Sequence, residues 1–198
     1  MVAIIDYGAG NLHSVKNALD FLGTDSVITG DKDVILNADR VILPGVGSFG
    51  DAMENLRQRD LVETVRSVAD GKRPFLGICL GLHLLFEGSE ETPGVEGLGV
   101  FKGNVVKIPD YGLKIPHMGW NNISLAKDSR VLSDDNPFVY FVHSYYINPD
   151  NTDIISAYTE YGKKLAVAIE DGNIFAVQFH PEKSGDEGME ILRKFLAI

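Results

Sequence analysis

The sequence predicts an α/β fold with a mixed, mainly parallel central sheet, helices on its faces and additional antiparallel strands. In residues 1–90, short apolar runs alternate with amphipathic helical patterns, which is typical of parallel βαβ units. In residues 98–179, short aromatic and β-branched runs are separated by Asn, Asp, Gly and Pro, which favours antiparallel strands. The last residues return to helical periodicity.

The amino-terminal half begins with an apolar strand, Val2 to Ile5, followed by the glycine turn 6-DYGAGN-11. A helix comes next, because apolar residues then recur on one helical face until Gly23, which is suited to end it. The further elements expected in this half are strands at 26–29, 40–43 and 75–78, and one or two helices over 51–69. Since parallel strands end at one edge of a sheet, Gly8, Gly45 and Cys79 should gather there.

The carboxyl-terminal half is expected to extend or flank this sheet. Its strand-like runs lie at 104–108, 138–143, 154–159, 165–170 and 174–179. The turn 171-DGN-173 separates two of these runs and predicts a hairpin. A closing helix is indicated by helical spacing of Met189, Leu192, Phe195 and Leu196.

Composition limits the class of protein. A chain of 198 residues without a linker, repeat or low-complexity tract is expected to form a single domain over 1–198. No apolar run reaches the roughly 20 residues of a membrane span, and the amino terminus lacks the features of a signal peptide. One cysteine excludes an internal disulfide and fits the cytoplasm. A net charge of −10 argues against nucleic-acid binding.

The only cysteine, Cys79, lies between two glycines where an apolar strand meets a helical pattern. A side chain at such a strand-to-helix turn is held in a strained and accessible position, and the glycines allow the turn to close. Backbone N–H groups at the start of the helix favour a thiolate there. Taken alone, the pattern fits a nucleophile and a buried apolar cysteine about equally well.

A thiolate nucleophile needs a base, and the base needs a partner that orients it. Of the five histidines, only His180 is followed by such a partner, Glu182, and Pro181 between them removes one backbone donor. In an extended chain these two side chains would project to the same side, about 6.6 Å apart at roughly 3.3 Å per residue. Beside the Cys79 turn, this pair indicates a Cys-His-Glu triad.

Acyl transfer also requires donors for the developing oxyanion. One is the backbone N–H of Leu80, which follows the nucleophile. The glycine loop 44-PGVGSFG-50 is the candidate source of the others, through Gly45, Val46 and Gly47. The same glycines would also suit a plain strand-to-helix connection.

These motifs, in this order and spacing, resemble those of class I (triad) glutamine amidotransferases, which have a flavodoxin-like fold. The resemblance extends over essentially the whole chain. A narrower resemblance to the glutaminase subunits of imidazole glycerol phosphate synthases is carried by 6-DYGAGN-11, 116-PHMGWN-121 and 140-YFVHSYY-146.

The resemblance implies the reaction. Cys79 would attack the side-chain amide of L-glutamine, His180 would move the proton to the leaving ammonia, and Glu182 would orient His180. Water would then hydrolyse the glutamyl thioester to L-glutamate. The ammonia would pass to a cyclase subunit, a (βα)8 barrel, for imidazole glycerol phosphate and AICAR formation in histidine biosynthesis. The chain would therefore act within a heterodimer, without a cofactor.

The resemblance also implies positions for substrate and partner contacts. Glu91, Ser144 and Tyr145 match residues that hold the substrate. The segments around Asn11 and Trp120 match the face that docks on the cyclase, and we expect His117 and Asn121 there too. His83 stands where the family commonly has Gln, and we expect it to contact the substrate with altered affinity.

Other interpretations remain at this stage. His143 fits either a structural role in a turn or a substrate contact, and His13 a solvent or interface position. No Cys/His cluster has zinc-ligand spacing, so we expect no metal. The alternatives for the whole chain are a class I glutaminase serving another synthase, or a related triad cysteine hydrolase. A nucleotide site at 8-GAGNLHS-14 is disfavoured because the third glycine of that motif is absent.

Overall fold

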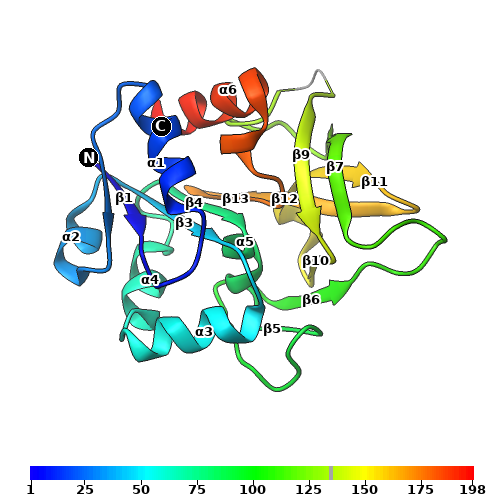
Figure 1. Cartoon of the computed structure of the whole chain (residues 1–198), viewed down its shortest axis with the longest axis horizontal. Coiled ribbons are helices and arrows are strands. Elements are labelled where there is room, and N and C mark those ends of the chain that lie inside the picture. Colours follow the sequence, from blue (N-terminus) through cyan, green and yellow to red (C-terminus); the bar gives the residue numbers. More distant parts are fainter. Residues whose placement is uncertain (134–135) are drawn as a thin grey trace.

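The computed structural model describes residues 1–133 and 136–198. Its centre is an eight-stranded sheet in the order β2-β1-β3-β4-β13-β12-β11-β8 (Figure 1). Strands β2, β1, β3, β4 and β13 are mutually parallel, and the remaining three pair antiparallel. The prediction of a mixed, mainly parallel α/β sheet is therefore confirmed.

The parallel part contains the following elements: β1 (Val2–Ile5), α1 (Leu12–Phe21), β2 (Ser26–Thr29), α2 (Lys32–Asn37), β3 (Arg40–Gly45), α3 (Phe49–Gln58), α4 (Val62–Val68), β4 (Phe75–Cys79) and α5 (Leu80–Leu84). Residues 51–69 thus contribute to two helices, because the chain reverses at Asp60, which has a positive φ of 53°. Helix α2 was not predicted, and at six residues it is too short to show a clear apolar period.

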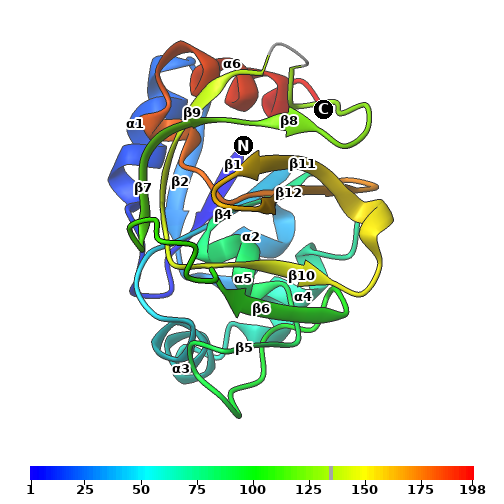
Figure 2. The ribbon, with the colours of Figure 1, turned by 90° about the vertical axis from the view of Figure 1, so that its right-hand side faces the viewer.

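The rest of the chain contains β5 (Gly88–Ser89), β6 (Gly103–Lys107), β7 (His117–Asn122), β8 (Ser124–Leu125), β9 (Phe138–His143), β10 (Tyr145–Pro149), η1 (Thr152–Ile154), β11 (Ile155–Glu160), β12 (Lys164–Asp171), β13 (Ile174–Val177), η2 (Pro181–Lys183) and α6 (Gly185–Leu196). Two small sheets, β10-β6-β5 and β7-β9, lie beside the central sheet (Figure 2). The 171-DGN-173 hairpin is confirmed, since Asp171 pairs with Ile174.

Two apolar clusters cover the two faces of the sheet. Along β1, Ala3 and Ile5 belong to one cluster and Val2 and Ile4 to the other, as the strand period of two requires. The first cluster is completed by apolar residues of α2, α3, α4 and α5, and the second by those of α1, α6 and β9. Figure 1 shows α1 and α6 on one side of the sheet and α3 and α4 on the other.

Strand β13 decides where the predicted motifs meet. It forms a hairpin with β12 but lies parallel to β4, with Val177 opposite Ile78. The carboxyl end of β13 is therefore beside the carboxyl end of β4, and residues that follow both strands share one edge. In the described ranges, no helix is both long and apolar enough to cross a membrane.

Candidate active site

The loops that follow β3, β4 and β13 line one cavity of about 310 Å³ at the carboxyl edge of the sheet. Gly45 and Cys79 are opposite each other in the β3–β4 register. The cavity is lined by Val46, Gly47, Cys79, Leu80, His83, Glu91, Pro116, Val142, His143, Ser144, Tyr145 and His180. Most of the catalytic and substrate-contact candidates from the sequence therefore meet in one place.

Cys79 lies at the junction of β4 and α5 with φ 54° and ψ −108°, a conformation that an L-residue rarely adopts. Gly81, two residues after Cys79, must lack a side chain, because a Cβ there would lie 1.9 Å from the carbonyl oxygen of Leu43. The close approach of α5 to β3 is thus what requires this glycine. Cys79 is 7% exposed, and this small exposed area faces the cavity.

His180 and Glu182 form a buried pair beside this cysteine. His180 Nδ1 lies 2.9 Å from Glu182 Oε1, and the two side chains are 2% and 1% exposed. Since a carboxylate only accepts, Nδ1 carries the hydrogen when the ring is neutral. His180 Nε2 is buried and has no hydrogen-bond partner among the described residues.

The extended geometry expected for this pair was wrong. Pro181–Lys183 form a 3₁₀ turn, with Pro181 at its first position, where the fixed φ of proline suits a helical turn. Strand β13 ends at Val177, before His180. The 3₁₀ turn brings Glu182 back to the imidazole of His180. The expected contact therefore forms across a turn and not along an extended chain.

The surroundings of His180 change its pKa strongly. Burial alone would lower the pKa of the imidazole, but Cys79 and Glu182 act against it and raise the pKa to about 9. The positively charged imidazolium is thus stabilised by its position between Cys79 and the Glu182 carboxylate. This arrangement can hold a proton ready for transfer near neutral pH.

The glycine loop reaches the same cavity with Val46 and Gly47, while Leu80 contributes from the start of α5. Tyr7 was not singled out from the sequence. Its hydroxyl is buried without a hydrogen-bond partner in the described part of the chain, and a Cβ on Gly45 would lie 2.5 Å from it. Burial, followed by the nearby Cys79, raises the pKa of this hydroxyl, so it stays neutral beneath the loop.

The expected substrate contacts are at the cavity wall, but two of them already have protein partners. Glu91 Oε2 accepts a hydrogen bond from the Phe49 N–H at 2.8 Å, which caps α3. His83 Nε2 lies 2.6 Å from Gln178 Oε1. Ser144 and Tyr145 line the cavity at the break between β9 and β10.

His143 and His117 form a buried chain of hydrogen bonds. His143 Nδ1 donates to the Tyr145 carbonyl at 2.9 Å, so its Nε2 accepts from His117 Nδ1, also at 2.9 Å. His117 Nε2 then accepts from the Asn121 amide at 3.3 Å. Burial lowers the pKa of His143 to about 3 and that of His117 to about 4, so both rings are neutral.

The expectation that His117 contacts a partner is not supported for its ring, which is 3% exposed and stacked between Phe141 and Tyr161. The hydropathy of the sequence could not show this burial, because the polar His117 is buried while the apolar Met118 and Trp120 of the same strand are exposed. The Asn121 amide also donates within the chain, to the Glu160 carbonyl at 3.0 Å. Asn11 is half-buried, and its side-chain oxygen accepts from Ser14.

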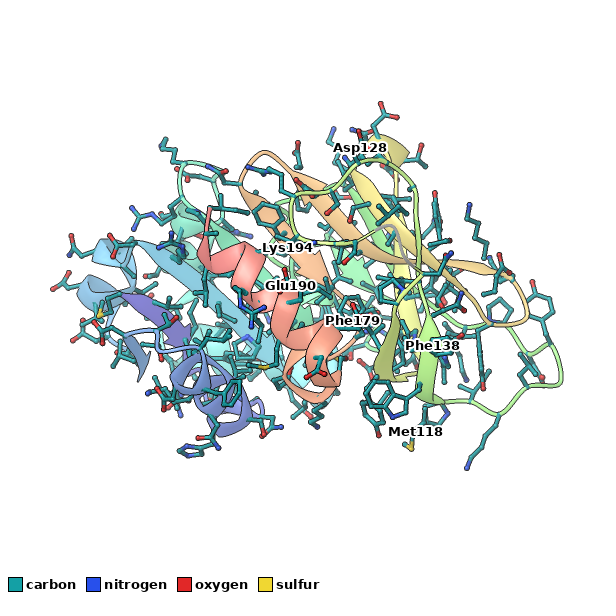
Figure 3. The ribbon with its side chains drawn as sticks, turned by 90° about the horizontal axis from the view of Figure 1, so that it is seen from above. Met118, Asp128, Phe138, Phe179, Glu190 and Lys194 are labelled. Atoms are coloured by element: carbon teal, nitrogen blue, oxygen red, sulfur yellow. The ribbon has the colours of Figure 1, made fainter. Side chains whose placement is uncertain are left out.

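Other side chains of the β7–β9 sheet face solvent. Trp120, Met118 and Phe138 are each more than half exposed, and the Trp120 ring edge lies against Tyr140. Figure 3 shows Met118 and Phe138 on the β7–β9 side of the molecule. Large apolar side chains grouped on one surface are typical of a protein–protein interface.

Within residues 1–133 and 136–198, no cluster of three His, Cys, Asp or Glu side chains is placed to hold a metal ion. Gln178 is a site residue that the sequence motifs did not single out. Its signal was its place beside His180 in 178-QFHPEKS-184, just after an apolar strand. Its side-chain nitrogen lies 3.8 Å from Cys79 Sγ.

The glutamine amidotransferase class-I family matches residues 3–198 of the chain. The chain is 50% identical to the imidazole glycerol phosphate synthase subunit HisH of Methanothermobacter thermautotrophicus, a match that covers 100% of this chain and 98% of that protein. It is 48% identical to the subunit of the same name from Methanocaldococcus jannaschii, with both chains covered completely.

Solved structures agree in fold. A crystal structure of glutamine amidotransferase has a TM-score of 0.77 at 21% identity and covers 100% of this chain and 98% of its own. PurLQS from Thermotoga maritima has a TM-score of 0.78 at 17% identity and covers 99% of this chain and 97% of its own. These likenesses concern the fold alone.

Proposed function

The chain belongs to the glutamine amidotransferase class-I family, and we propose that it is the glutaminase subunit of imidazole glycerol phosphate synthase in histidine biosynthesis. Identity of 50% over the full length to a HisH subunit supports this function. The activity is supported above all by one observation. Cys79 and His180 line the same cavity, and Glu182 holds the Nδ1 side of His180, while Nε2 has no hydrogen-bond partner in residues 1–133 and 136–198.

In the first half of the proposed reaction, the Cys79 thiolate attacks the side-chain carbonyl carbon of L-glutamine, and a carbon–sulfur bond forms. The carbonyl oxygen becomes an oxyanion. When the tetrahedral intermediate collapses, the carbon–nitrogen bond breaks and His180 Nε2 gives its proton to the leaving nitrogen. Ammonia departs and a glutamyl thioester remains, with His180 neutral.

In the second half, a water molecule attacks the thioester carbonyl carbon while His180 Nε2 accepts its proton. Collapse of this second intermediate expels the Cys79 thiolate and releases L-glutamate. Glu182 keeps the ring in the tautomer with hydrogen on Nδ1, so Nε2 serves as acid in one step and base in the other. The raised pKa of His180 suits the first of these roles.

The oxyanion is proposed to bind at backbone N–H groups of Leu80 and of the Gly45-Val46-Gly47 loop, each such donor contributing roughly 3–4 kcal/mol in the transition state. Ser144 and Tyr145 are proposed to contact the amino-acid end of glutamine, together with the Glu91 oxygen not used by Phe49. His83 lies at the cavity wall but already bonds Gln178.

The proposed partner is a cyclase subunit with a (βα)8 barrel, which uses the ammonia to form imidazole glycerol phosphate and AICAR. Ammonia released to water becomes ammonium near neutral pH, so a partner that covers the site would retain it. The exposed side chains of Met118, Trp120 and Phe138 provide an apolar docking surface beside the site. We expect this heterodimer in the cytoplasm.

The test is release of L-glutamate from L-glutamine by the wild type and by Cys79→Ala, each with and without the cyclase subunit and its ligand. The proposal expects low activity alone, strong stimulation in the complex, and no activity in the variant. Full turnover by the isolated chain without the ligand would favour a free-standing hydrolase instead. A panel of other amides separates a glutaminase from a related triad hydrolase.

A further inference from the structure

Gln178 occupies a position from which its side chain can act on the nucleophile. It directly follows β13, and its backbone N–H donates to the Val167 carbonyl at 2.8 Å, so the main chain there is held by β12. The residue is fully buried. A primary amide in such surroundings is stable only when both its oxygen and its nitrogen have partners.

The Gln178 amide is oriented by His83. Burial lowers the pKa of His83 to about 4, despite its hydrogen bond to Gln178, so the ring is neutral and carries one hydrogen. His83 Nε2 lies 2.6 Å from Gln178 Oε1, and a carbonyl oxygen only accepts. The hydrogen of His83 is therefore on Nε2, which donates to Gln178 Oε1. This hydrogen bond fixes the orientation of the amide, so that its nitrogen faces away from His83.

The other end of the amide faces Cys79, with Gln178 Nε2 at 3.8 Å from Sγ, a hydrogen-bond distance for sulfur. An amide N–H directed at a thiolate stabilises the charged form, and bonds to a charged acceptor are stronger than neutral ones. Helix α5 has only five residues, so its dipole is small and a specific donor matters more here.

We propose that Gln178 and His83 form a positioning pair for the nucleophile, in which the Gln178 amide donates to the Cys79 thiolate and His83 holds that amide in place. The inference rests on the proposed function, because it takes Cys79 as the nucleophile. His180 acts on the proton, whereas Gln178 keeps its own hydrogen and stabilises the charge on sulfur before the thiolate attacks and again when the thiolate is expelled. His83 thus acts through Gln178, a role distinct from direct contact with substrate.

The first test uses the isolated full chain and the rate of alkylation by iodoacetamide across pH. Cys79 is the only thiol, so the signal has one source, and the midpoint of the profile reports thiolate formation independently of access. The variant Gln178→Met keeps the length of the side chain but lacks the donor, and should move the midpoint to higher pH by about one unit. His83→Leu should move it in the same direction by about half as much.

His83→Gln is the matched control, because a glutamine amide can still donate to Gln178 Oε1. The midpoint of its alkylation profile should stay within about 0.2 pH units of the wild type. If His83 only filled space, His83→Gln and His83→Leu would instead have the same midpoint. Unchanged midpoints in both Gln178→Met and His83→Leu, with wild-type circular dichroism, would overturn the pair. Should Gln178→Met not fold, His83→Leu decides alone.

The second test measures glutamine hydrolysis in the complex with the cyclase. Loss of the donor in Gln178→Met should lower kcat about tenfold while KM for glutamine changes less than about twofold, since Gln178 acts on the nucleophile and is not among the residues that line the cavity. A raised KM at constant kcat would assign both residues to substrate binding and overturn the pair. A wild-type complex that fails to hydrolyse glutamine would overturn only the glutaminase function, because the alkylation profiles do not depend on it.

Discussion

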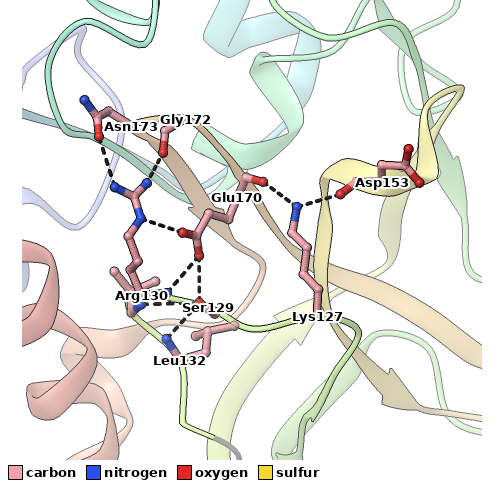
Figure 4. A network of polar contacts seen from close by, with 9 residues as sticks. Lys127, Ser129, Arg130, Leu132, Asp153, Glu170, Gly172 and Asn173 are labelled. Atoms are coloured by element: carbon pink, nitrogen blue, oxygen red, sulfur yellow. Dashed lines mark hydrogen bonds and ion pairs between the residues drawn. The ribbon is translucent and has the colours of Figure 1, made fainter.

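Strand β13 (Ile174–Val177) lies between two groups of buried polar side chains that are treated in opposite ways: one around Glu170 of β12, beside its amino end, and one at His180 and Glu182, which follow its carboxyl end. At its amino end, the Glu170 carboxylate and the side chains around it are paired with one another (Figure 4). At its carboxyl end, His180 Nε2 and Glu182 Oε2 are buried and have no partner among the described residues. The strand between the two groups is only four residues long, so the contrast arises over a short stretch of chain.

The polar contacts at the amino end, which we call the clasp, join Lys127, Ser129 and Arg130 to Glu170 and serve the stability of the fold. Glu170 accepts from Ser129 Oγ and Arg130 Nε, both at 2.8 Å, and from the Arg130 backbone N–H at 3.2 Å. Arg130 also donates to the Gly172 carbonyl and the Asn173 side chain, while Lys127 donates to the carbonyls of Glu170 and Asp153. These contacts fasten the loop before β9 to the β12–β13 hairpin.

In the part of the chain that the structure describes, the carboxyl end leaves His180 Nε2 and Glu182 Oε2 without partners, at a cost in stability of roughly 1–3 kcal/mol for each such buried group. Beside it, Cys79 at the carboxyl end of β4 has a positive φ. Such features persist where the surrounding structure enforces them, and they concentrate at functional sites. The comparison therefore predicts that substitutions at the carboxyl end reduce activity, and those at the amino end reduce stability.

The largest expected effect is that of Cys79→Ala on turnover. Glutamine hydrolysis in the complex should fall by about 10⁴-fold or more, because no other group in the cavity can form the thioester. The free energy of unfolding should change by less than about 2 kcal/mol, since the residue fills little volume. Glutamate release and urea denaturation measure the two quantities, and residual turnover near the wild type would contradict the nucleophile.

Glu182→Gln should reduce kcat by about 10²–10⁴-fold, because a neutral amide no longer fixes the tautomer of His180. Glu182 also helps to raise the pKa of His180 to about 9, so its loss lowers that pKa. The alkaline limb of the kcat–pH profile should then move to lower pH, as the imidazolium needed for the first step is lost earlier. The exposed Glu187→Gln is the matched control and should leave the profile in place.

Acid should destabilise the fold through its neutral histidines. The pKa values of His83 and His143 are lowered by burial to about 4 and about 3, below the unfolded value of about 6.5, so the unfolded state binds more protons. Their contribution to stability is complete above about pH 6.5 and is lost as pH falls toward 4, by about 1.4 kcal/mol per pH unit for each ring.

The free energy of unfolding is measured by urea denaturation at pH values between 7 and 5. In His83→Gln, the slope of this free energy against pH should correspond to one bound proton fewer. His180 acts in the opposite direction. Its raised pKa gives stability that is complete below about pH 6.5 and is lost as pH rises through about 9. A stability that stays flat from pH 7 to pH 5 would show that these rings are not held neutral.

The smallest effect concerns the clasp. Glu170→Gln should lower the free energy of unfolding by about 2 kcal/mol, because hydrogen bonds to a charged group are weakened although Arg130 remains half-exposed. Activity per folded molecule should stay within about twofold of the wild type. The exposed Glu160→Gln is the charge-matched control. A large fall in kcat with normal stability would remove the distinction between the two ends.

Local patterns in the sequence were sufficient for much of the fold. Val2–Ile5, Ser26–Thr29 and the 171-DGN-173 hairpin are as predicted, because their apolar runs and turn residues act over a few neighbouring positions. Strands β7 and β10 were not predicted, since Gly119 and Pro149 interrupt their apolar patterns and pairing with β9 and β6 stabilises them. The extended geometry at His180 failed because a proline-led turn follows.

For the site, the sequence by itself determined which chemical groups are present: one thiol, a histidine with a glutamate two residues on, and glycine loops at strand ends. Only the tertiary structure decided that β13 lies parallel to β4, which places His180 and Gln178 beside Cys79 across about 100 residues of chain. It alone also buried His117 and joined His83 to Gln178. Such contacts depend on strand order and packing between distant segments, and hydrophobic periodicity carries only local information.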